Sequence, residues 1–270
     1  MAVIALSSSA SGLTALSTDL DVIANNLANL NTTGFKRSRL NFQDLMYIER
    51  KQPGVQNLNG DERPMGLYVG LGVEASGTQK NFTPGAAQST GNELDVMIQG
   101  RGFFQFRVES DLAQNGIAYS RAGNLAKNSD GDLVLATDTG RVLEPQITIP
   151  PDATSVSIGP DGKVSVIVSG QVDPQEIGQI ELATFVNPAG LKEVGENLFV
   201  PTAASGNVIT AIPGQDGSGF LQQKFLEASN VEPTKELVDL IRTQRAFELN
   251  GQVLRAADET LRQINALRRQ

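Results

Sequence analysis

The stretch PTKELVDLIRTQRAFELNGQVLRAADETLRQINAL, residues 233–267, decides the fold. Apolar residues recur in it at every seventh position, at Leu240, Phe247, Leu254 and Leu261. Ala257 and Ile264 stand three positions after the last two of these. A stripe kept over several heptads is typical of a helix that packs against another helix. At about 1.5 Å per residue, this helix would be on the order of 50 Å long, so it needs a partner along its length.

The two ends of this stretch carry the signals that start and stop a helix. Asn230 is expected to cap the helix, and Pro233 falls in its first turn, where a missing N–H group is tolerated. Arg268 and Arg269 lie at its carboxyl end, where the helix dipole favours cations. The sequence therefore predicts one helix over residues 233–267.

A second heptad stripe opens the chain. Its members are Leu6, Leu13, Leu20 and Leu27, with Leu16, Ile23 and Leu30 three positions after the last three. The helix is expected to end at NTTG, residues 31–34, where Gly34 suits a left-handed cap. Two arrangements remain open: the terminal helices pair as a coiled coil, or each packs as an amphipathic helix on a globular core. The narrow stripe favours the coiled coil.

Two polar features near the first helix are interpreted as facing solvent. Asn25, Asn26 and Asn29 are poor helix formers, and a solvated polar face is favoured over hydrogen bonding across a packed interface. FKRSR, residues 35–39, is the only dense basic cluster, and a solvated loop is expected there.

The next stretch is expected to form an arm. Phe42, Leu45 and Met46 have the spacing of a short helix. Residues 52–66 are rich in Gly, Asn, Pro and charge, which predicts a long loop or an extended arm. The side chains expected to anchor this arm on a neighbouring molecule are Tyr47, Pro53, Val55, Leu58 and Tyr68.

The middle of the chain follows a different pattern. From residue 67 to about 225, short runs rich in Val, Ile and Phe alternate with turn signals such as NSDG at 128–131 and PDG at 160–162. This pattern predicts antiparallel strands joined by tight hairpins. The expected fold class is therefore α+β. Long N- and C-terminal helices (residues 1–34 and 226–270) pair as a coiled-coil-like core, and between them lie a linker with an extended arm (35–70) and an antiparallel all-β domain (71–225).

Composition argues against several classes of function. The 270 residues carry a net charge of −8, and the pI is near 4.7, so nucleic acid is not an expected partner. The chain contains no Cys, His or Trp, which removes most zinc ligands and the usual Ser–His and Cys–His nucleophiles. We expect no enzyme activity, no catalytic residue and no cofactor. No run of 18 apolar residues is present, and the first Lys is Lys36, so neither a membrane span nor a cleaved signal peptide is predicted.

One stretch has some likeness to a metal-binding loop. NSDGD, residues 128–132, resembles the start of a calcium loop, but it lacks the Glu that would complete the ligand set, and strand residues follow at once. A hairpin turn is favoured over a calcium site, and no metal is expected. The glycine pairs at 70–72 and 100–102 lack the later glycine of a dinucleotide-binding loop and are interpreted as turns.

Several longer motifs, in order along nearly the whole chain, closely resemble those of the bacterial flagellar rod and hook protein family. They are LDVIANNLAN (20–29), TGFK (33–36), DVMIQGRGFF (95–104), YSRAG (119–123), EASNV (227–231), ELV (236–238) and QRAFE (244–248). Within the family, residues 47–66 resemble the insertion found in distal rod members. The Ser-rich start, residues 7–11, departs from the bulkier sequence expected there.

This resemblance implies a structural subunit that polymerises head-to-tail into the hollow distal rod, a drive shaft from motor to hook. It implies other copies of the chain, neighbouring axial proteins, surrounding ring proteins and the flagellar export apparatus as partners. It also implies a place in the basal body, where the rod crosses the periplasm after export without signal cleavage. The alternative within the family is a proximal rod or hook-type subunit. From other classes, a secreted enzyme with a site in the β domain and a free coiled-coil binding module stay open.

Overall fold

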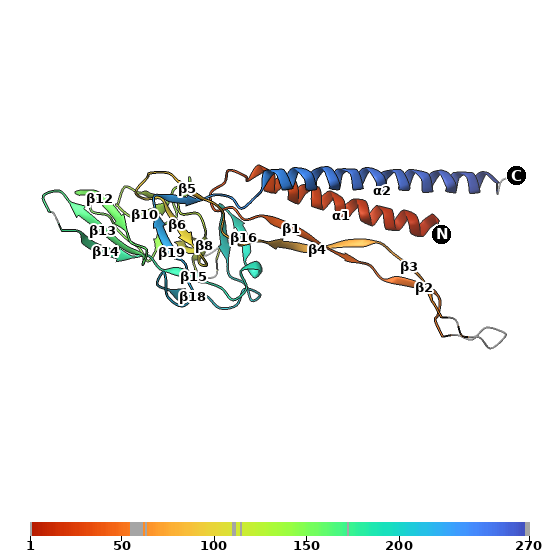
Figure 1. Ribbon diagram of the computed structural model, residues 1–270, viewed down its shortest axis with the longest axis horizontal. Coiled ribbons are helices and arrows are strands. Elements are labelled where there is room, and N and C mark those ends of the chain that lie inside the picture. Colours follow the sequence, from red (N-terminus) through yellow and green to blue (C-terminus); the bar gives the residue numbers. More distant parts are fainter. Residues whose placement is uncertain are drawn as a thin grey trace. The chain divides into compact units, whose positions relative to one another are not determined.

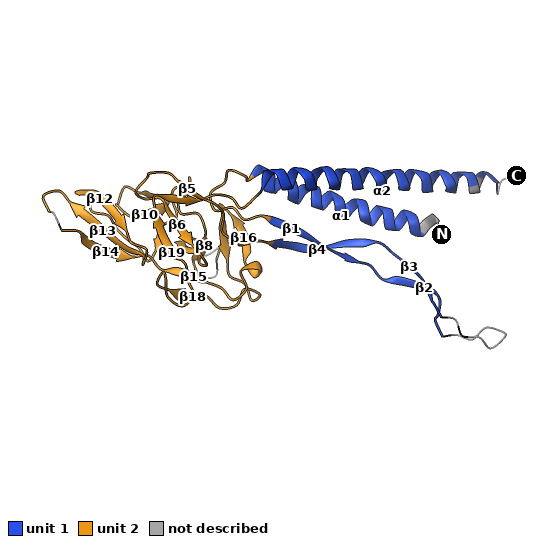
Figure 2. Cartoon of the chain, viewed as in Figure 1, with its two compact units in different colours: residues 1–28, 38–79, 232–270 blue, residues 29–37, 80–231 orange. Residues whose placement is uncertain are grey.

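A computed structural model of the chain describes residues 2–54, 62, 64–109, 112–113, 115–171 and 173–267. The chain divides into two compact units, shown in different colours in Figure 2. The first, here called the helical unit, contains residues 1–28, 38–79 and 232–270, and the second, the β unit, contains residues 29–37 and 80–231. The backbone therefore passes between the units four times.

The helical unit contains both long helices and a β ribbon. Its elements are α1 (Ala2–Ala28), α2 (Pro233–Leu267), β1 (Ser38–Asp44), β2 (Tyr47–Lys51), β3 (Leu67–Gly70) and β4 (Val73–Lys80), whose last residue belongs to the β unit. Helix α2 has the bounds predicted from the sequence, and α1 ends at Ala28, before NTTG. Figure 1 shows α1 beside α2 along one side and beside β1 along the other.

Strand β1 pairs with β4, and β2 pairs antiparallel with β3. Hydrogen bonds from Leu45 N to Gly72 O (2.9 Å) and from Leu71 N to Met46 O (3.1 Å) link the two pairs. The short helix predicted at residues 42–46 was therefore wrong, because these residues continue a ribbon whose hydrogen bonds come from a segment about 30 residues further along the chain.

Small residues allow the elements of the helical unit to approach closely. Val73 N donates to Ser11 Oγ (3.3 Å), and a Cβ atom on Gly72, whose φ is +126°, would lie 2.1 Å from that oxygen. On the α2 side, the same position on Gly12 would contact Asn250 at 3.6 Å. The Ser-rich start of the chain, which departed from the expected sequence, thus provides room for the ribbon beside α1.

The β unit consists of short antiparallel strands, as predicted. The strands are β5 (Ala87–Ser89), β6 (Val96–Gln99), β7 (Phe104–Arg107), β8 (Ile117–Ser120), β9 (Leu125–Lys127), β10 (Leu133–Leu135), β11 (Leu143–Glu144), β12 (Ala153–Ile158), β13 (Lys163–Val168), β14 (Gln175–Gln179), β15 (Leu182–Thr184), β16 (Lys192–Gly195), β17 (Leu198–Val200), β18 (Ile209–Ala211), β19 (Phe220–Gln223) and β20 (Phe225–Glu227). A five-stranded sheet in the order β11-β7-β8-β17-β16 and a three-stranded sheet β12-β13-β14 are its largest sheets. A 3-10 turn, Pro188–Gly190, precedes β16.

The core of the β unit comes from the inward faces of these strands. One cluster joins residues such as Ile98, Phe104 and Leu133, all fully buried. A second, aromatic cluster includes Phe103 and Tyr119, with rings packed edge to face against neighbouring Phe side chains. Burial of this apolar surface is the main force that holds the unit together.

The two predicted turns join neighbouring strands. Residues 128–132 connect β9 to β10, and residues 159–162 connect β12 to β13. Asp132, the last residue of the calcium-like stretch, accepts hydrogen bonds from Thr148 Oγ1 (2.5 Å) and Gln146 Nε2 (2.9 Å), which hold the pKa of its carboxyl below the usual value. Its oxygens are thus occupied by neutral donors of the fold. Within the described ranges, no cluster of three or more acidic side chains has the arrangement of a metal site, and no described helix meets the length and apolarity that a membrane crossing requires.

Candidate functional site

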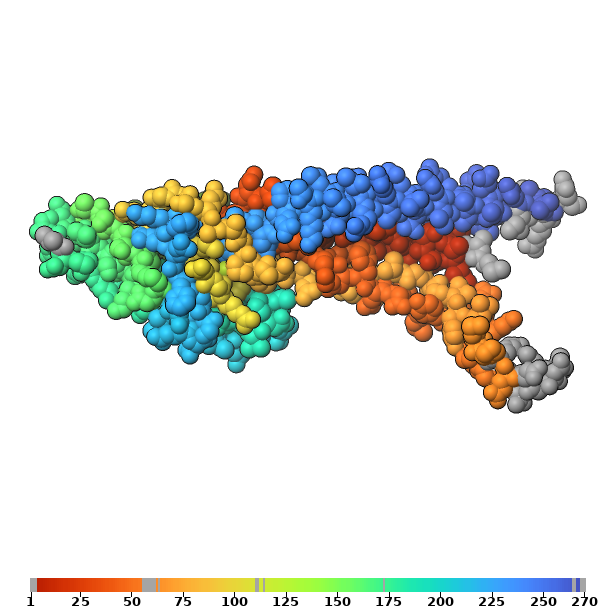
Figure 3. Space-filling view, viewed as in Figure 1, coloured from red at the N-terminus to blue at the C-terminus, as the bar shows by residue number. Residues whose placement is uncertain are grey.

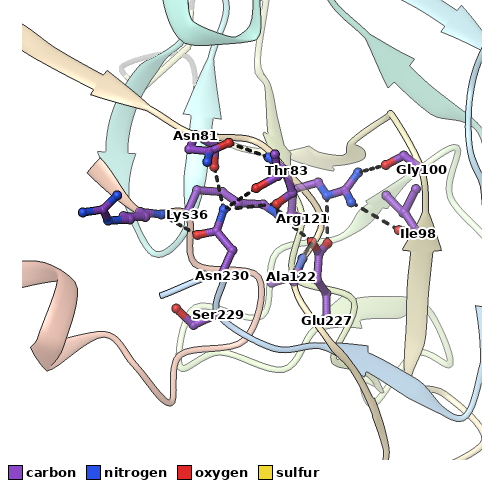
Figure 4. A network of polar contacts seen from close by, with 12 residues as sticks. Lys36, Asn81, Thr83, Ile98, Gly100, Arg121, Ala122, Glu227, Ser229 and Asn230 are labelled. Atoms are coloured by element: carbon purple, nitrogen blue, oxygen red, sulfur yellow. Dashed lines mark hydrogen bonds and ion pairs between the residues drawn. The ribbon is translucent and has the colours of Figure 1, made fainter. Parts of the chain in front are cut away.

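Three segments of the β unit that are distant in sequence meet at one place, shown in Figure 4. They are residues 33–37, 81–85 and 227–231, and we call their meeting place the junction. Each segment adjoins a passage of the backbone into the helical unit, after Arg37, before Lys80 and after Val231. The junction is therefore where three of the four passages leave the β unit.

One part of the junction, here called the amide layer, is centred on Asn230. Its Oδ1 accepts a hydrogen bond from Arg37 N (2.7 Å), and its Nδ2 donates to Asn81 O (2.7 Å) and Thr83 O (3.1 Å). The backbone adds a bond from Asn81 N to Arg37 O (2.9 Å) and one from Asn230 N to Phe35 O (3.4 Å). One side-chain amide thus connects all three segments, and both of its ends are fixed by main-chain partners.

The predicted role of Asn230 as the cap of α2 was wrong. Helix α2 begins at Pro233, three residues later, and the Asn230 side chain points to the other two segments of the junction. A cap and a long-range contact use the same chemistry, a side-chain oxygen accepting from a main-chain N–H. The sequence alone did not distinguish them.

The second part of the junction, the charge layer, is a buried cluster of three charged side chains. Lys36 Nζ lies 2.5 Å from Glu227 Oε1, and Arg121 Nε lies 2.9 Å from Glu227 Oε2. The side chains of Lys36 and Glu227 are 0% exposed, and that of Arg121 is 3% exposed. Two cations share one carboxylate away from water, so the cluster is stable only if the remaining donors find acceptors.

Those acceptors are main-chain carbonyls. Lys36 Nζ donates to Thr83 O (2.9 Å), and the Arg121 guanidinium donates to the carbonyls of Gly100 (2.9 Å), Gly102 (2.7 Å) and Ile98 (3.2 Å). Glu227 Oε1 also accepts from the backbone N–H of Gly85, at 2.9 Å. The charge layer therefore binds the same three segments as the amide layer, and Arg121 ties them to the β6–β7 turn.

Burial has a direct electrostatic effect on Lys36. Removal from water lowers the pKa of its amino group below the usual value, although the Glu227 carboxylate acts in the opposite direction. The expected solvated basic loop at residues 35–39 is thus wrong at Lys36. Glycine is required at position 34, shortly before Lys36, for two reasons. The φ of Gly34 is +70°, and a Cβ atom there would lie 2.8 Å from the backbone of residues 121 and 122.

The helical unit has a polar contact of its own. Asn26 is 1% exposed; its Nδ2 donates to Ser38 O (2.8 Å) and Glu236 Oε2 (3.1 Å), and its Oδ1 accepts from Ser38 N (3.0 Å). A solvated polar face was therefore the wrong interpretation of Asn26, which joins α1, β1 and α2. A second polar link across the helices runs from Thr243 Oγ1 to Asp19 Oδ2, at 2.9 Å.

The leucine stripes predicted to form the helix seam are only partly covered within one chain. Of the predicted assembly residues on α1 and after it, Ile23 is buried, whereas Leu13, Leu16, Leu20, Leu27 and Leu30 are half-buried. On α2, Leu240, Leu254 and Leu261 are half-buried, Phe247 is exposed, and the side chain of Ile264 lies outside the described residues. The buried face of α1 includes smaller or polar residues instead, such as Ser9, Ala15 and Asn26.

Helix α2 exposes further apolar residues outside the predicted heptad positions. They are Leu237, Val238, Ile241, Leu249 and Val253, and their side chains are 49–60% exposed. They lie away from the half-buried stripe that faces α1, and Figure 3 shows the outer side of α2 (blue) open along its length. Apolar surface exposed at several positions of one helix is available for contact with another protein.

The predicted arm residues lie on the β2–β3 pair and in the connection beyond it. Tyr47, Pro53 and Tyr68 are exposed, whereas Val55 and Leu58 lie outside the described residues. Met46 and Met65 are also exposed, at 81% and 80%. Among the described residues, Met46, Tyr47, Met65 and Tyr68 are each more than half exposed, so this segment forms a second exposed apolar surface of the helical unit.

Comparison with known proteins gives three family matches along the chain. Residues 6–36 match the model described as flagella basal body rod protein, residues 97–166 the flagellar hook protein FlgE/F/G D1 domain, and residues 222–267 the flagellar basal body rod FlgEFG protein C-terminal region. Each match supplies one member of the charge layer: Lys36, Arg121 and Glu227 respectively.

Curated relatives are similar over almost the full length. The flagellar basal-body rod protein FlgG of Buchnera aphidicola subsp. Schizaphis graminum is 43% identical over 96% of this chain and 97% of its own. FlgG of Caulobacter vibrioides is 43% identical over 98% of this chain and 99% of its own, and the flagellar basal-body rod protein FlgF of the same organism is 34% identical over 92% and 93%.

Proposed function

Because the chain belongs to the family of flagellar basal-body rod proteins, we propose that copies of it stack head-to-tail into a hollow helical shaft that transmits torque from the motor to the hook. The chain is a structural subunit of the flagellar basal body, of the distal rod type. The FlgG relatives support this type, because in Caulobacter vibrioides FlgG is more similar to this chain than FlgF is, at 43% against 34% identity.

The observation that best supports self-assembly is the apolar surface that remains exposed on the helical unit. The half-buried leucine stripes and the exposed residues of α2, including Leu237 and Leu249, offer apolar contacts along the length of the helix. A single chain buries only part of this surface, and burial against further copies would contribute about 25 cal/mol per Å². Head-to-tail contacts that do not close into a ring produce an open helical filament.

The exposed β2–β3 pair supports a second role. Tyr47 and Tyr68 are half exposed, and aromatic side chains of this kind commonly anchor protein interfaces. We assign this segment as an arm that contacts a neighbouring subunit and limits sliding along the helix seam. Stiffness of the shaft would then depend on contacts away from its axis.

The remaining partners and the location follow from the same assignment. The rod subunit contacts other axial proteins at its ends and ring proteins around it, and it reaches the periplasm through the flagellar export apparatus without signal cleavage. A proximal rod or hook-type subunit is the alternative, supported by the FlgF relative at 34% identity. Labelling of the subunit in isolated basal bodies separates these positions along the axis.

Electron microscopy of the purified protein tests the proposal. We expect straight, hollow filaments from the wild-type chain and none from Leu254→Asp, which places a charge in the half-buried stripe. Leu112→Asp, the same substitution at an exposed leucine of the β unit, is the matched control and should assemble. Protected amides in β7 and β8 would show that both variants keep the β unit folded. Normal filaments from Leu254→Asp would contradict a helix-based assembly.

A further inference from the structure

The junction offers an inference about how load passes through a single subunit. Three backbone segments leave the β unit within the reach of one side chain, and each is joined to the other two by both layers. Without such links, a load on one segment would be carried into the β unit by that segment alone. We propose that Asn230 is a positioning residue that couples the three exit segments, so that a load on one is shared by all. The proposal rests on the torque-transmitting role proposed above.

The chemistry of Asn230 is matched to this task. Its oxygen faces a donor, Arg37 N, and its nitrogen faces acceptors, Asn81 O and Thr83 O, so that the amide has only one productive orientation. An aspartate could accept from Arg37 but could not donate to the two carbonyls. A leucine of similar volume could do neither. Both the donor and the acceptor of the amide are therefore required.

A second bond distinguishes a coupling role of Asn230 from a purely local one. Asn81 N donates to Arg37 O at 2.9 Å, which joins two segments directly. Asn230 takes no part in this bond, but it holds Arg37 through the N–H and Asn81 through the carbonyl. If Asn230 positions the segments, this bond depends on it; if Asn230 only fills its own site, the bond survives its removal.

The charge layer joins the same three segments through residues that all belong to the β unit. Lys36 and Glu227 lie one and three residues from Arg37 and Asn230, and they repeat the three-way connection through Thr83 O, an acceptor that both layers share. Arg121 fixes this layer to three carbonyls around the β6–β7 turn. We expect the β core and this layer to remain folded when Asn230 is changed, because their contacts do not include its side chain. The effect of Asn230 on the exit segments can therefore be measured in a folded unit.

Hydrogen exchange of single amides on the soluble chain, followed by NMR, tests the proposal. In Asn230→Ala, we expect the Arg37 and Asn81 amides each to exchange about tenfold faster, as the loss of a net hydrogen bond predicts. Amides of β7 should keep their protection. Ser229→Ala is the matched control, because Ser229 is the adjacent residue and, within the described ranges, its hydroxyl accepts only a long bond from Val231 N (3.4 Å). Acceleration at Arg37 alone would overturn the proposal.

A second variant keeps the test decisive if Asn230→Ala also loses protection in β7. Asn230→Asp retains the acceptor for Arg37 N and loses both donors, and its charge faces two carbonyl oxygens. The Asn81 amide should then exchange faster while the Arg37 amide stays protected. Unchanged exchange at Asn81 would refute the coupling. Because exchange is measured on soluble chains, these results stand whether or not the chain forms filaments, so a failure of the assembly proposal is distinguishable from a failure of this one.

Discussion

Replacement of Glu227 by Gln is the sharpest test of the charge layer. The substitution preserves the shape of the side chain and removes its charge, which leaves Lys36 and Arg121 buried with no counter-ion. Breaking a buried ion pair by removing one partner destabilises a protein by about 3–5 kcal/mol. The Gln oxygen still accepts one hydrogen bond, and Arg121 keeps three carbonyl acceptors. We therefore expect the lower end, a loss of about 3 kcal/mol in the free energy of unfolding of the β unit.

The matched control is Glu144→Gln. Glu144 also forms a short bond with an arginine, Arg107 Nη2, at 2.7 Å, but the two side chains are 34% and 55% exposed. An ion pair that remains in contact with water contributes less than about 1 kcal/mol. Comparison of the two variants separates the effect of burial from the loss of an Arg–Glu contact.

Urea unfolding at pH 7, followed by hydrogen exchange of the peptide that covers β6 and β7, reports on the β unit alone. A loss of less than about 1 kcal/mol for Glu227→Gln, or one equal to that of Glu144→Gln, would refute the idea that the buried carboxylate holds the cluster together. Addition of Lys36→Met to Glu227→Gln removes one unpaired cation. The double variant should therefore be less destabilised than the sum of the single variants.

Other predictions concern pH, the arm and the buried amide of α1. Burial lowers the pKa of Lys36 in the folded chain, so the unfolded chain binds more protons at pH values between that lowered pKa and 10.5, and the free energy of unfolding rises with pH in this window. The urea midpoint of Lys36→Met should lack this rise. If the midpoints of the variant and the wild type rose equally with pH, the prediction would be contradicted. Deletion of residues 52–63 should leave assembly intact but shorten the persistence length of the filaments in electron micrographs. Deletion filaments as stiff as those of the wild type would contradict the arm proposal. Asn26→Leu should destabilise the helical unit by about 1–3 kcal/mol, measured by exchange in α1, and wild-type protection of these amides would contradict this role of Asn26.

Sequence patterns predicted the elements whose causes are local. Helix α2 follows from its heptads and from Pro233, and the β9–β10 hairpin follows from a run of turn residues. The helix predicted at residues 42–46 was wrong because its periodicity was weak and the deciding hydrogen bonds came from β4 and the turn before it. Local spacing predicts a strand poorly when its only partner lies elsewhere in the chain.

The junction was beyond such patterns because its contacts are long in sequence. Lys36 and Glu227 are separated by 191 residues, and Arg121 and Glu227 by 106. A lysine beside two arginines is most often exposed, and nothing in the spacing marks Lys36 as the buried member. The available signal was coarser: each of the three residues falls inside a motif that carries the family resemblance. Asn26, on the other hand, stood among three asparagines of the predicted helix, and its burial and its contacts with Ser38 and Glu236 depend on segments that local spacing does not reveal.

The polar groups of the junction are better explained by the fixed positions that their hydrogen bonds impose than by a gain in the free energy of unfolding. A buried ion pair replaced by apolar residues of similar volume is often as stable or more stable, so the charges of Lys36, Arg121 and Glu227 are weak evidence of a need for stability. Apolar contacts are non-directional, and segments held only by them can shift while keeping most of their buried area. Hydrogen bonds at 2.5–2.9 Å between these three side chains require fixed donor and acceptor positions. A subunit whose backbone leaves one unit by several segments needs such fixed positions, because a small shift in one segment would otherwise not be transmitted to the others.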